Sequence, residues 1–128
     1  MQPMVVAFGE AEKGLFQTPL FFRSLIELVE KLGHPPPESE GLYFAIQSLL
    51  YHRPILFFRV QEEGYSIEDY IVGLQQLFHK EKEHHFCALC LPGVGNPEIL
   101  EAAQPLVDRH KSCLIVREKD LYDYLTTF

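Results

Sequence analysis

Four short apolar segments, spread along the whole chain, constrain the fold more than any other feature of this sequence. They are MVVAF (4–8), ILFFRV (55–60), FCALCL (86–91) and CLIV (113–116). Each is rich in branched or aromatic residues and has almost no polar alternation, which is typical of strands covered on both faces. The sequence therefore predicts four buried strands at these positions.

The segment between the first two predicted strands favours two helices, because apolar residues recur there every three or four positions. Thr18 and Pro19 predict the N-cap and the first residue of the first helix, which ends at Gly33. The proline-rich HPPPES (34–39) predicts a loop, because proline has no backbone donor for a helix. Ser39 is then the predicted cap of the second helix.

Three more helices are predicted in the second half of the chain. The third begins after Ser66, the fourth after Asn96, and a short terminal helix begins near Asp120. Pro105 lies inside the apolar pattern of the fourth helix, so we expect a kink or break near residue 104.

The alternation of strands and helices predicts the fold class. The element order is β-α-α-β-α-β-α-β-α, and 128 residues are a usual length for one domain, here residues 1–128. We expect a three-layer α/β/α sandwich with a four-stranded, mainly parallel sheet. This pattern resembles the flavodoxin-like and Rossmann-like folds, a likeness that implies no particular chemistry.

Charge and composition limit the partners that the chain is expected to have. The formal net charge is −7, whereas nucleic acids and anionic membranes attract clusters of Lys and Arg, so we expect neither partner. No apolar run approaches the roughly 18 residues of a membrane span, and the first residues lack signal-peptide features. The three cysteines lie in apolar surroundings and suggest reduced core thiols, so a cytoplasmic location is expected.

The stretch HHFCALCLPGVGNP (84–97) contains a C-x-x-C motif that could bind a metal or undergo redox chemistry. Cys87 and Cys90 lie within a predicted strand, where residues three apart point to opposite faces. We therefore expect no metal site there, and Cys113 belongs to another strand. The histidines of HKEKEHH (79–85) are interpreted as a solvated loop rather than a metal cluster.

The glycines in the same stretch allow two interpretations. Gly93 and Gly95 stand between a strand and a helix N-terminus, where backbone N–H groups can bind an anion. However, Glu98 stands where the dinucleotide motif G-x-G-x-x-G requires its third glycine. A tight turn is the favoured interpretation, and phosphate binding is the alternative.

Each predicted strand is followed by a polar loop, and the ends of parallel strands lie at one edge of a sheet. With the third apolar segment beside the first, GEAEKG (9–14) would face PGVGN (92–96) across a crevice. The candidate ligand-binding residues are Gly9, Glu10, Glu12, Lys13, Gly14, Arg59, Glu62, Gly93, Gly95 and Asn96.

These residues lead to three hypotheses about function. The first is a binding or regulatory module for a small anionic ligand or nucleotide, with Lys13 and Arg59 among its positive groups. The second is a protein-interaction domain, such as a homodimer formed through aromatic residues of the terminal LYDYLTTF. The third is a metal-assisted hydrolase that uses Glu10 and Glu12, with Glu62 or Glu63. The sequence identifies neither a cofactor nor a catalytic residue.

Overall fold

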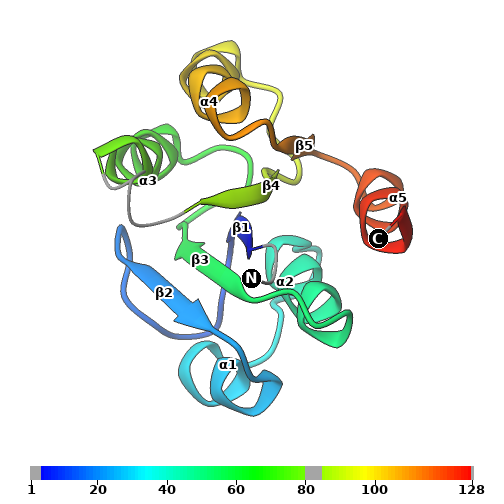
Figure 1. Ribbon diagram of the computed structural model, residues 1–128. Coiled ribbons are helices and arrows are strands. Elements are labelled where there is room, and N and C mark those ends of the chain that lie inside the picture. Colours follow the sequence, from blue (N-terminus) through cyan, green and yellow to red (C-terminus); the bar gives the residue numbers. More distant parts are fainter. Residues whose placement is uncertain (1–3, 80–84, 128) are drawn as a thin grey trace.

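The computed structural model describes residues 4–79 and 85–127, which form five strands and five helices (Figure 1). The strands are β1 (Met4–Gly9), β2 (Pro19–Phe22), β3 (Ile55–Arg59), β4 (Phe86–Cys90) and β5 (Cys113–Ile115). The helices are α1 (Leu25–Leu32), α2 (Gly41–Leu50), α3 (Ile67–His79), α4 (Pro97–His110) and α5 (Glu118–Thr127).

The five strands form one sheet in the order β2-β3-β1-β4-β5. All neighbouring strands are parallel except β2, which pairs antiparallel with β3 at the edge of the sheet. The four strands predicted from the apolar segments are confirmed, and they pair in parallel as expected. The predicted number of strands was wrong, because the sheet has five rather than four.

The fifth strand replaces the start of the predicted first helix. Pro19–Phe22 pairs with Phe58–Ile55, and Phe22 becomes 1% exposed against the core. Proline is well tolerated as the first residue of an edge strand, where its missing N–H costs no ladder bond. Helix α1 begins only at Leu25, and Ser24 caps it by accepting a bond from the Glu27 N–H. The prediction that Thr18 caps this helix was therefore wrong.

Helix α2 also differs from its predicted start. It begins at Gly41, and its N-cap residue, Glu40, makes no side-chain capping bond. The hydroxyl of Ser39 instead donates to the Pro36 carbonyl oxygen within the proline-rich loop. The Ser39 cap was therefore a wrong prediction, and the N–H groups at the start of α2 are bound by a residue far away in the sequence.

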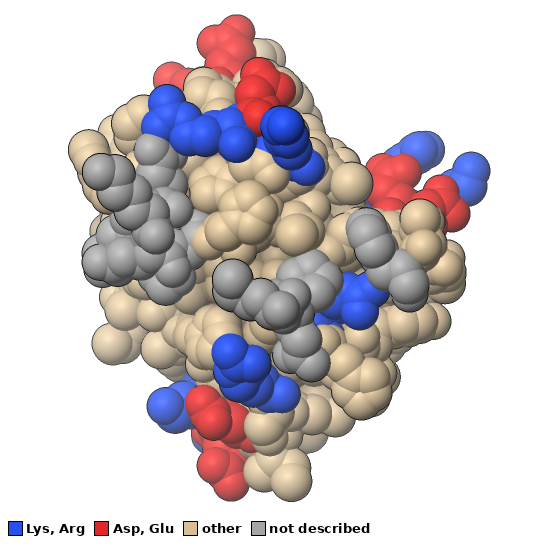
Figure 2. Space-filling view, in the orientation of Figure 1, with Lys and Arg blue, Asp and Glu red and all other residues tan. Residues whose placement is uncertain are grey.

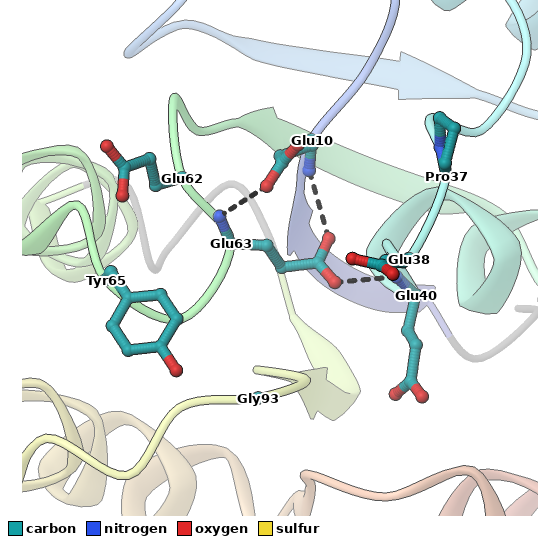
Figure 3. Close-up of a pocket in the computed structure, with 8 residues that line it drawn as sticks. All are labelled: Glu10, Pro37, Glu38, Glu40, Glu62, Glu63, Tyr65 and Gly93. Atoms are coloured by element: carbon teal, nitrogen blue, oxygen red, sulfur yellow. Dashed lines mark hydrogen bonds between the residues drawn. The ribbon is translucent and has the colours of Figure 1, made fainter.

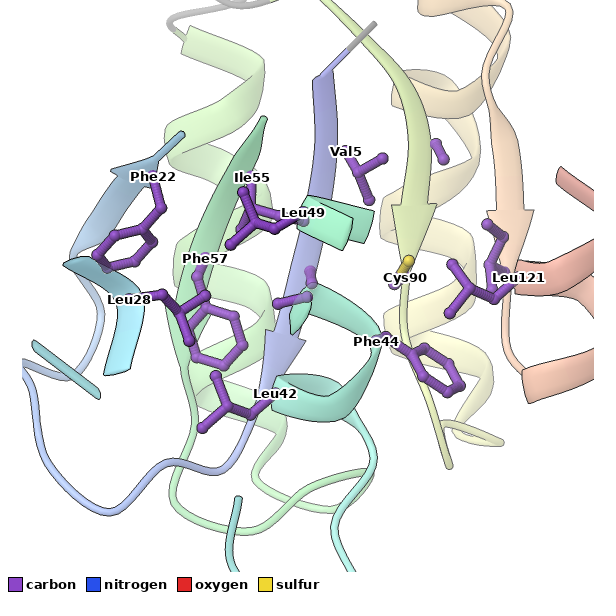
Figure 4. Packing of buried hydrophobic residues seen from close by; sticks show 14 of the residues in the cluster. Val5, Phe22, Leu28, Leu42, Phe44, Leu49, Ile55, Phe57, Cys90 and Leu121 are labelled. Carbon is purple, nitrogen blue, oxygen red and sulfur yellow. The ribbon is translucent and has the colours of Figure 1, made fainter. Parts of the chain in front are cut away.

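Helices cover both faces of the sheet (Figure 1) and enclose two apolar clusters, of which Figure 4 shows the one beside α1, α2 and α5. One cluster packs α1, α2 and α5 against side chains such as Val5, Phe57 and Cys90. The other packs α3 and α4 against side chains that include Phe8 and Phe58. Strand β1 contributes to both clusters and lies at the centre of the sheet, buried along its whole length.

Helix α4 matches its predicted start, and of the kink or break expected near residue 104, the break does not occur. The Asn96 side chain accepts bonds from the N–H groups of Glu98 and Ile99, as an N-cap should. The helix continues through Pro105 to His110 without interruption. The terminal helix α5 docks on its own sheet, with Tyr124 only 5% exposed.

The two cysteines of the C-x-x-C motif were expected on opposite faces of the sheet, and this expectation was wrong. Met4 pairs with Phe86, but the next residue, Val5, pairs with Ala88, so Cys87 is an extra residue that bulges out of β4. The bulge shifts the alternation by one position. As a result, Cys87 and Cys90 both pack on the cluster beside α5.

Two further expectations concern exposed residues. Cys113 is exposed rather than buried in the core. In the histidine-rich segment, His79 and His85 are exposed, while residues 80–84 lie outside the described part of the chain. Figure 2 shows Lys and Arg side chains scattered over one face of the molecule, with acidic side chains beside several of them. None of the helices described is both long enough and apolar enough to cross a membrane.

Candidate functional site

The ends of the three central strands meet around a cavity of about 510 Å³ (Figure 3). The chain leaves β1 towards β3 on one side and later reaches β4 on the other side, so the cavity lies where the strand order reverses. The residues that line it are Glu10, Pro37, Glu38, Glu40, Glu62, Glu63, Tyr65 and Gly93.

Glu63, in the loop after β3, joins the walls of this cavity. One oxygen of its carboxylate accepts bonds from the N–H groups of Glu10 and Gly41, each at 3.0 Å. The other oxygen accepts from the Glu40 N–H at 2.6 Å. This single side chain therefore binds the exit of β1 and the N-terminus of α2, where a negative charge is favoured by the helix dipole.

Glu10 makes the reciprocal hydrogen bond to Glu63. Its carboxylate accepts a bond of 2.9 Å from the N–H of Glu63, so the two residues exchange side-chain-to-backbone bonds. Both carboxylates are thus engaged in holding the loops after β1 and β3 together. We infer that Glu10 and Glu63 shape the cavity and leave ligand contacts to other side chains.

Two glycines allow the backbones beneath the cavity to touch. A β-carbon added at Gly41 would lie 2.5 Å from the α-carbon of Gly9, and one at Gly9 would lie 2.6 Å from the α-carbon of Gly41. Only residues without a side chain permit this approach between the end of β1 and the start of α2. Gly9, a predicted ligand-binding residue, therefore has a packing role.

Burial raises the pKa of the Glu63 carboxyl, because removing it from water disfavours its charge. The three N–H donors act in the opposite direction, and the nearby charge of Glu10 adds to the increase. Tyr70 lies behind the same loop, and burial also raises the pKa of its phenol. The Tyr70 hydroxyl accepts a bond of 2.7 Å from the Gly64 N–H, and its ring stacks on Phe8.

The side chains left to face solvent in the cavity are acidic and aromatic. Glu38, Glu40 and Glu62 are exposed, and Tyr65 is 76% exposed beside them. Among the described residues, the lining contains five glutamates and neither lysine nor arginine. The cavity is therefore a region of negative potential.

A second hollow of about 450 Å³ adjoins the first and shares Tyr65 and Gly93 with it. Its other lining residues are Gly64, Ile67, Gly95 and Asn96. Space is open beside the α-carbons of Gly93 and Gly95, and Gly93 has a φ of +76°, which favours glycine. The G-x-G turn thus lies at the cavity, although the Asn96 side chain is engaged in capping α4.

The structure brings together only some of the candidate residues from the sequence. Glu10, Glu62 and Gly93 line the cavity, and Gly95 and Asn96 line the adjoining hollow.

The remaining candidates lie elsewhere, beyond the lining of either hollow. The backbone N–H groups of Glu12 and Lys13 bind the Leu32 carbonyl oxygen at the end of α1. Arg59 donates to the Gly14 carbonyl oxygen at 2.6 Å, and its guanidinium lies 4.2 Å from the centre of the Phe16 ring. These contacts hold the loop after β1 against α1 and β3.

The list of candidate ligand-binding residues did not include Pro37, Glu38, Glu40, Glu63 and Tyr65. Of these, Glu63 was expected beside the crevice and in the hydrolase hypothesis only. Tyr65 and Glu63 belong to the loop after β3, which was already expected at this edge of the sheet. Their position in that loop was the signal that could have identified them. Residues 37–40 belong to the proline-rich loop between α1 and α2, whose place depends on β2. As long as β2 was not predicted, no feature of the chain placed this loop at the cavity.

Among residues 4–79 and 85–127, no group of three or more His, Cys, Asp or Glu side chains is arranged to hold a metal ion. Comparison of the chain with protein-family models, with curated proteins and with solved structures finds no match. The arrangement of the cavity is therefore the basis for any proposal about function.

Proposed function

We propose that this chain is a binding module whose ligand occupies the cavity at the carboxyl edge of the sheet. The observation that carries the proposal is the position of this cavity, enclosed by the exits of β1, β3 and β4 where the strand order reverses. Open α/β sheets of the layered, flavodoxin-like type bind their ligands at this point.

The charge of the lining favours a ligand with a positive group, such as an organic amine or guanidinium. Glu38, Glu40 and Glu62 supply exposed carboxylates, and the ring of Tyr65 offers a face for a cation. Exposed ion pairs contribute roughly 0.2–1 kcal/mol each, so we expect weak affinity that decreases with added salt.

The anionic ligand or nucleotide predicted from the sequence remains an alternative, but the charges near the cavity count against it. It depends on Lys13 and Arg59, and Arg59 is engaged with Gly14 and Phe16. A phosphate would also face the five glutamates of the lining.

The proposal can be tested by following backbone amide signals by NMR during titration with spermidine, and in parallel with ATP. We expect spermidine to shift signals of residues 62–65 and 93–96, and ATP to leave them unchanged. The shifts should weaken in Glu38→Gln/Glu40→Gln and persist in the control Glu101→Gln, which changes an exposed glutamate on α4. Shifts with ATP alone, or none with either compound, would contradict a cation site.

A second candidate function is self-association, for which the edge strand β2 is the specific observation. Within the described part of the chain, no strand pairs with its outer edge, and unpaired edges readily join another chain. Phe16 and Phe21 are 39% and 41% exposed, and Leu15 and Ile26 are 66% and 72% exposed. Light scattering would show a dimer that Phe21→Lys abolishes, whereas a monomer at high concentration would contradict this function.

The hydrolase hypothesis finds less support than either of these. The Glu10 carboxylate is bonded to the Glu63 N–H, and Glu12 contacts Gly33 rather than the cavity. The described residues also contain no arrangement for a metal ion, which that mechanism would require.

A further inference from the structure

Two cysteines on neighbouring strands share one accessible corner of the sheet. Cys87 lies in the bulge of β4 and is partly exposed, and Cys113 begins β5 and is exposed. Both carry free thiols in this structure. The third cysteine, Cys90, is fully buried three residues beyond Cys87.

The bulge turns Cys87 and Cys113 to the same face of the sheet. Cys113 pairs with Ala88, whose side chain packs in the cluster beside α5, and Ile115 on the same strand packs there too. Cys87 packs on this cluster as well, because it is the extra residue of β4. In a regular strand, Cys87 would face the side opposite to Ala88 and could not approach Cys113.

The register also sets the distance between the two cysteines. Cys113 is directly beside Ala88, so Cys87 is one residue away along the neighbouring strand. A strand spacing of about 4.8 Å and a rise of about 3.3 Å place the two α-carbons roughly 6 Å apart. Disulfides join α-carbons about 4.4–6.8 Å apart, so the two thiols can be bridged without moving the strands.

We propose that Cys87 and Cys113 are a reversible modification site that forms an intramolecular disulfide with a small-molecule disulfide as oxidant. The thiolate of Cys113 attacks one sulfur of the small disulfide, which releases one small thiol and leaves a mixed disulfide on Cys113. The thiolate of Cys87 then attacks the Cys113 sulfur and releases the second small thiol. The two cysteines lose two electrons and two protons, which the two small thiols gain.

The exposure and burial of the two cysteines indicate that Cys113 reacts first and Cys87 second. Cys113 is the more exposed thiol and is reached first by an oxidant from solvent. Burial raises the pKa of the Cys87 thiol, an effect that Cys113 increases and Arg53 opposes. The raised pKa leaves only a small fraction of Cys87 as the thiolate that attacks the mixed disulfide near neutral pH, so this second step should be the slower one and should speed up as the pH rises.

The bond would fasten the edge strand β5, which has three residues, to its neighbour β4. It would also close a loop that contains the whole of α4. Such a closure reduces the freedom of the unfolded chain, so we expect oxidation to raise Tm by roughly 5–15 °C.

The test treats the full chain with excess oxidised glutathione, blocks remaining thiols and digests the protein with trypsin for mass spectrometry. The expected product links peptide 83–109 to peptide 112–117, with the loss of two hydrogen atoms from the chain. Because the first peptide holds both Cys87 and Cys90, the control is Cys90→Ala, which should retain the link. Cys87→Ser and Cys113→Ser should lose it, and dithiothreitol should reverse it.

Three outcomes would overturn the proposal. They are glutathione retained on Cys113 with Cys87 still free, a link that disappears in Cys90→Ala, and a disulfide that joins two chains. Cys113 is exposed and Cys87 is only partly buried, so we expect both serine variants to fold like the parent chain. A thermal melt of each reduced variant checks this.

Discussion

Glu63→Ala removes the carboxylate that binds three backbone N–H groups at the cavity, and we expect it to destabilise the fold strongly. The bonds from Glu10 and Gly41 are partly buried, whereas the bond from Glu40 is exposed to solvent. Water replaces the exposed bond readily, so its loss costs little. The two partly buried N–H groups lose a charged acceptor that water replaces only in part.

Hydrogen bonds to charged groups contribute about 1.5–3 kcal/mol each, so the two partly buried bonds account for roughly 3–6 kcal/mol. Part of this is offset, because the variant no longer buries a carboxylate beside the charge of Glu10. The expected net loss is about 2–4 kcal/mol of the free energy of unfolding. That is a large share of the roughly 5–15 kcal/mol of an ordinary domain.

Urea unfolding at pH 7, followed by circular dichroism, measures this loss. The matched control is Glu62→Ala, which removes the neighbouring, exposed glutamate and should change stability by less than about 0.5 kcal/mol. Equal effects of the two substitutions, or a loss below about 1 kcal/mol for Glu63→Ala, would refute the assignment of Glu63 as the residue that joins these loops.

Three other predictions concern the same region. Gly41→Ala places a β-carbon 2.5 Å from the Gly9 α-carbon and should cost about 1–3 kcal/mol in urea unfolding, whereas Gly95→Ala has free space and should cost almost nothing. Tyr70→Phe removes the acceptor of the Gly64 N–H and should cost about 1–3 kcal/mol, with a neutral result contradicting that bond. In a carbon-detected NMR titration, the pKa of Glu63 should exceed its ordinary value of 4.5. The folded state then holds this proton more tightly than the unfolded state does. The contribution of Glu63 to the free energy of unfolding should therefore decrease as the pH rises from 4.5 through the folded pKa.

The parallel part of the sheet was predictable because long apolar segments leave few alternatives. Strands β3, β4 and β5 fall within the predicted segments, and β1 extends one residue beyond its segment, to Gly9. Each of these strands must be covered on both faces. The missing element, β2, has only four residues, PLFF, and its neighbouring apolar residues fit a helical period equally well. The local sequence pattern could not distinguish a strand from a helix here, and pairing with β3 makes this segment a strand.

Counting the crossings of the sheet would have revealed the missing strand. The chain leaves β1 at the carboxyl edge of the sheet. Without β2, one helix would take it to the opposite edge, and a second helix would take it back to the carboxyl edge. It could then enter β3 only in the antiparallel direction. One more crossing is needed for β1 and β3 to be parallel, and β2 supplies it. The same count places the loop between α1 and α2 at the carboxyl edge, where Glu38 and Glu40 line the cavity.

The site was less predictable than the fold, because its bonds connect residues distant in sequence. The pattern of polar strand exits indicated the edge of the sheet at which Glu10, Glu62 and Gly93 line one cavity. It could not show that the carboxylate of Glu63 is bound by an N–H group 53 residues away. Nor could it anticipate the bulge at Cys87, since one extra residue changes the face of a side chain without changing the apolar pattern.

The long-range cap on α2 has a consequence for how the chain folds. Helices α1 and α4 carry their own caps, Ser24 and Asn96, and can begin to form from local interactions alone. Helix α2 has no such local start, because the acceptor for its first N–H groups lies beyond β3. Its nucleation therefore depends on prior closure of a long loop, and α2 should become ordered only once β1 and β3 have come together.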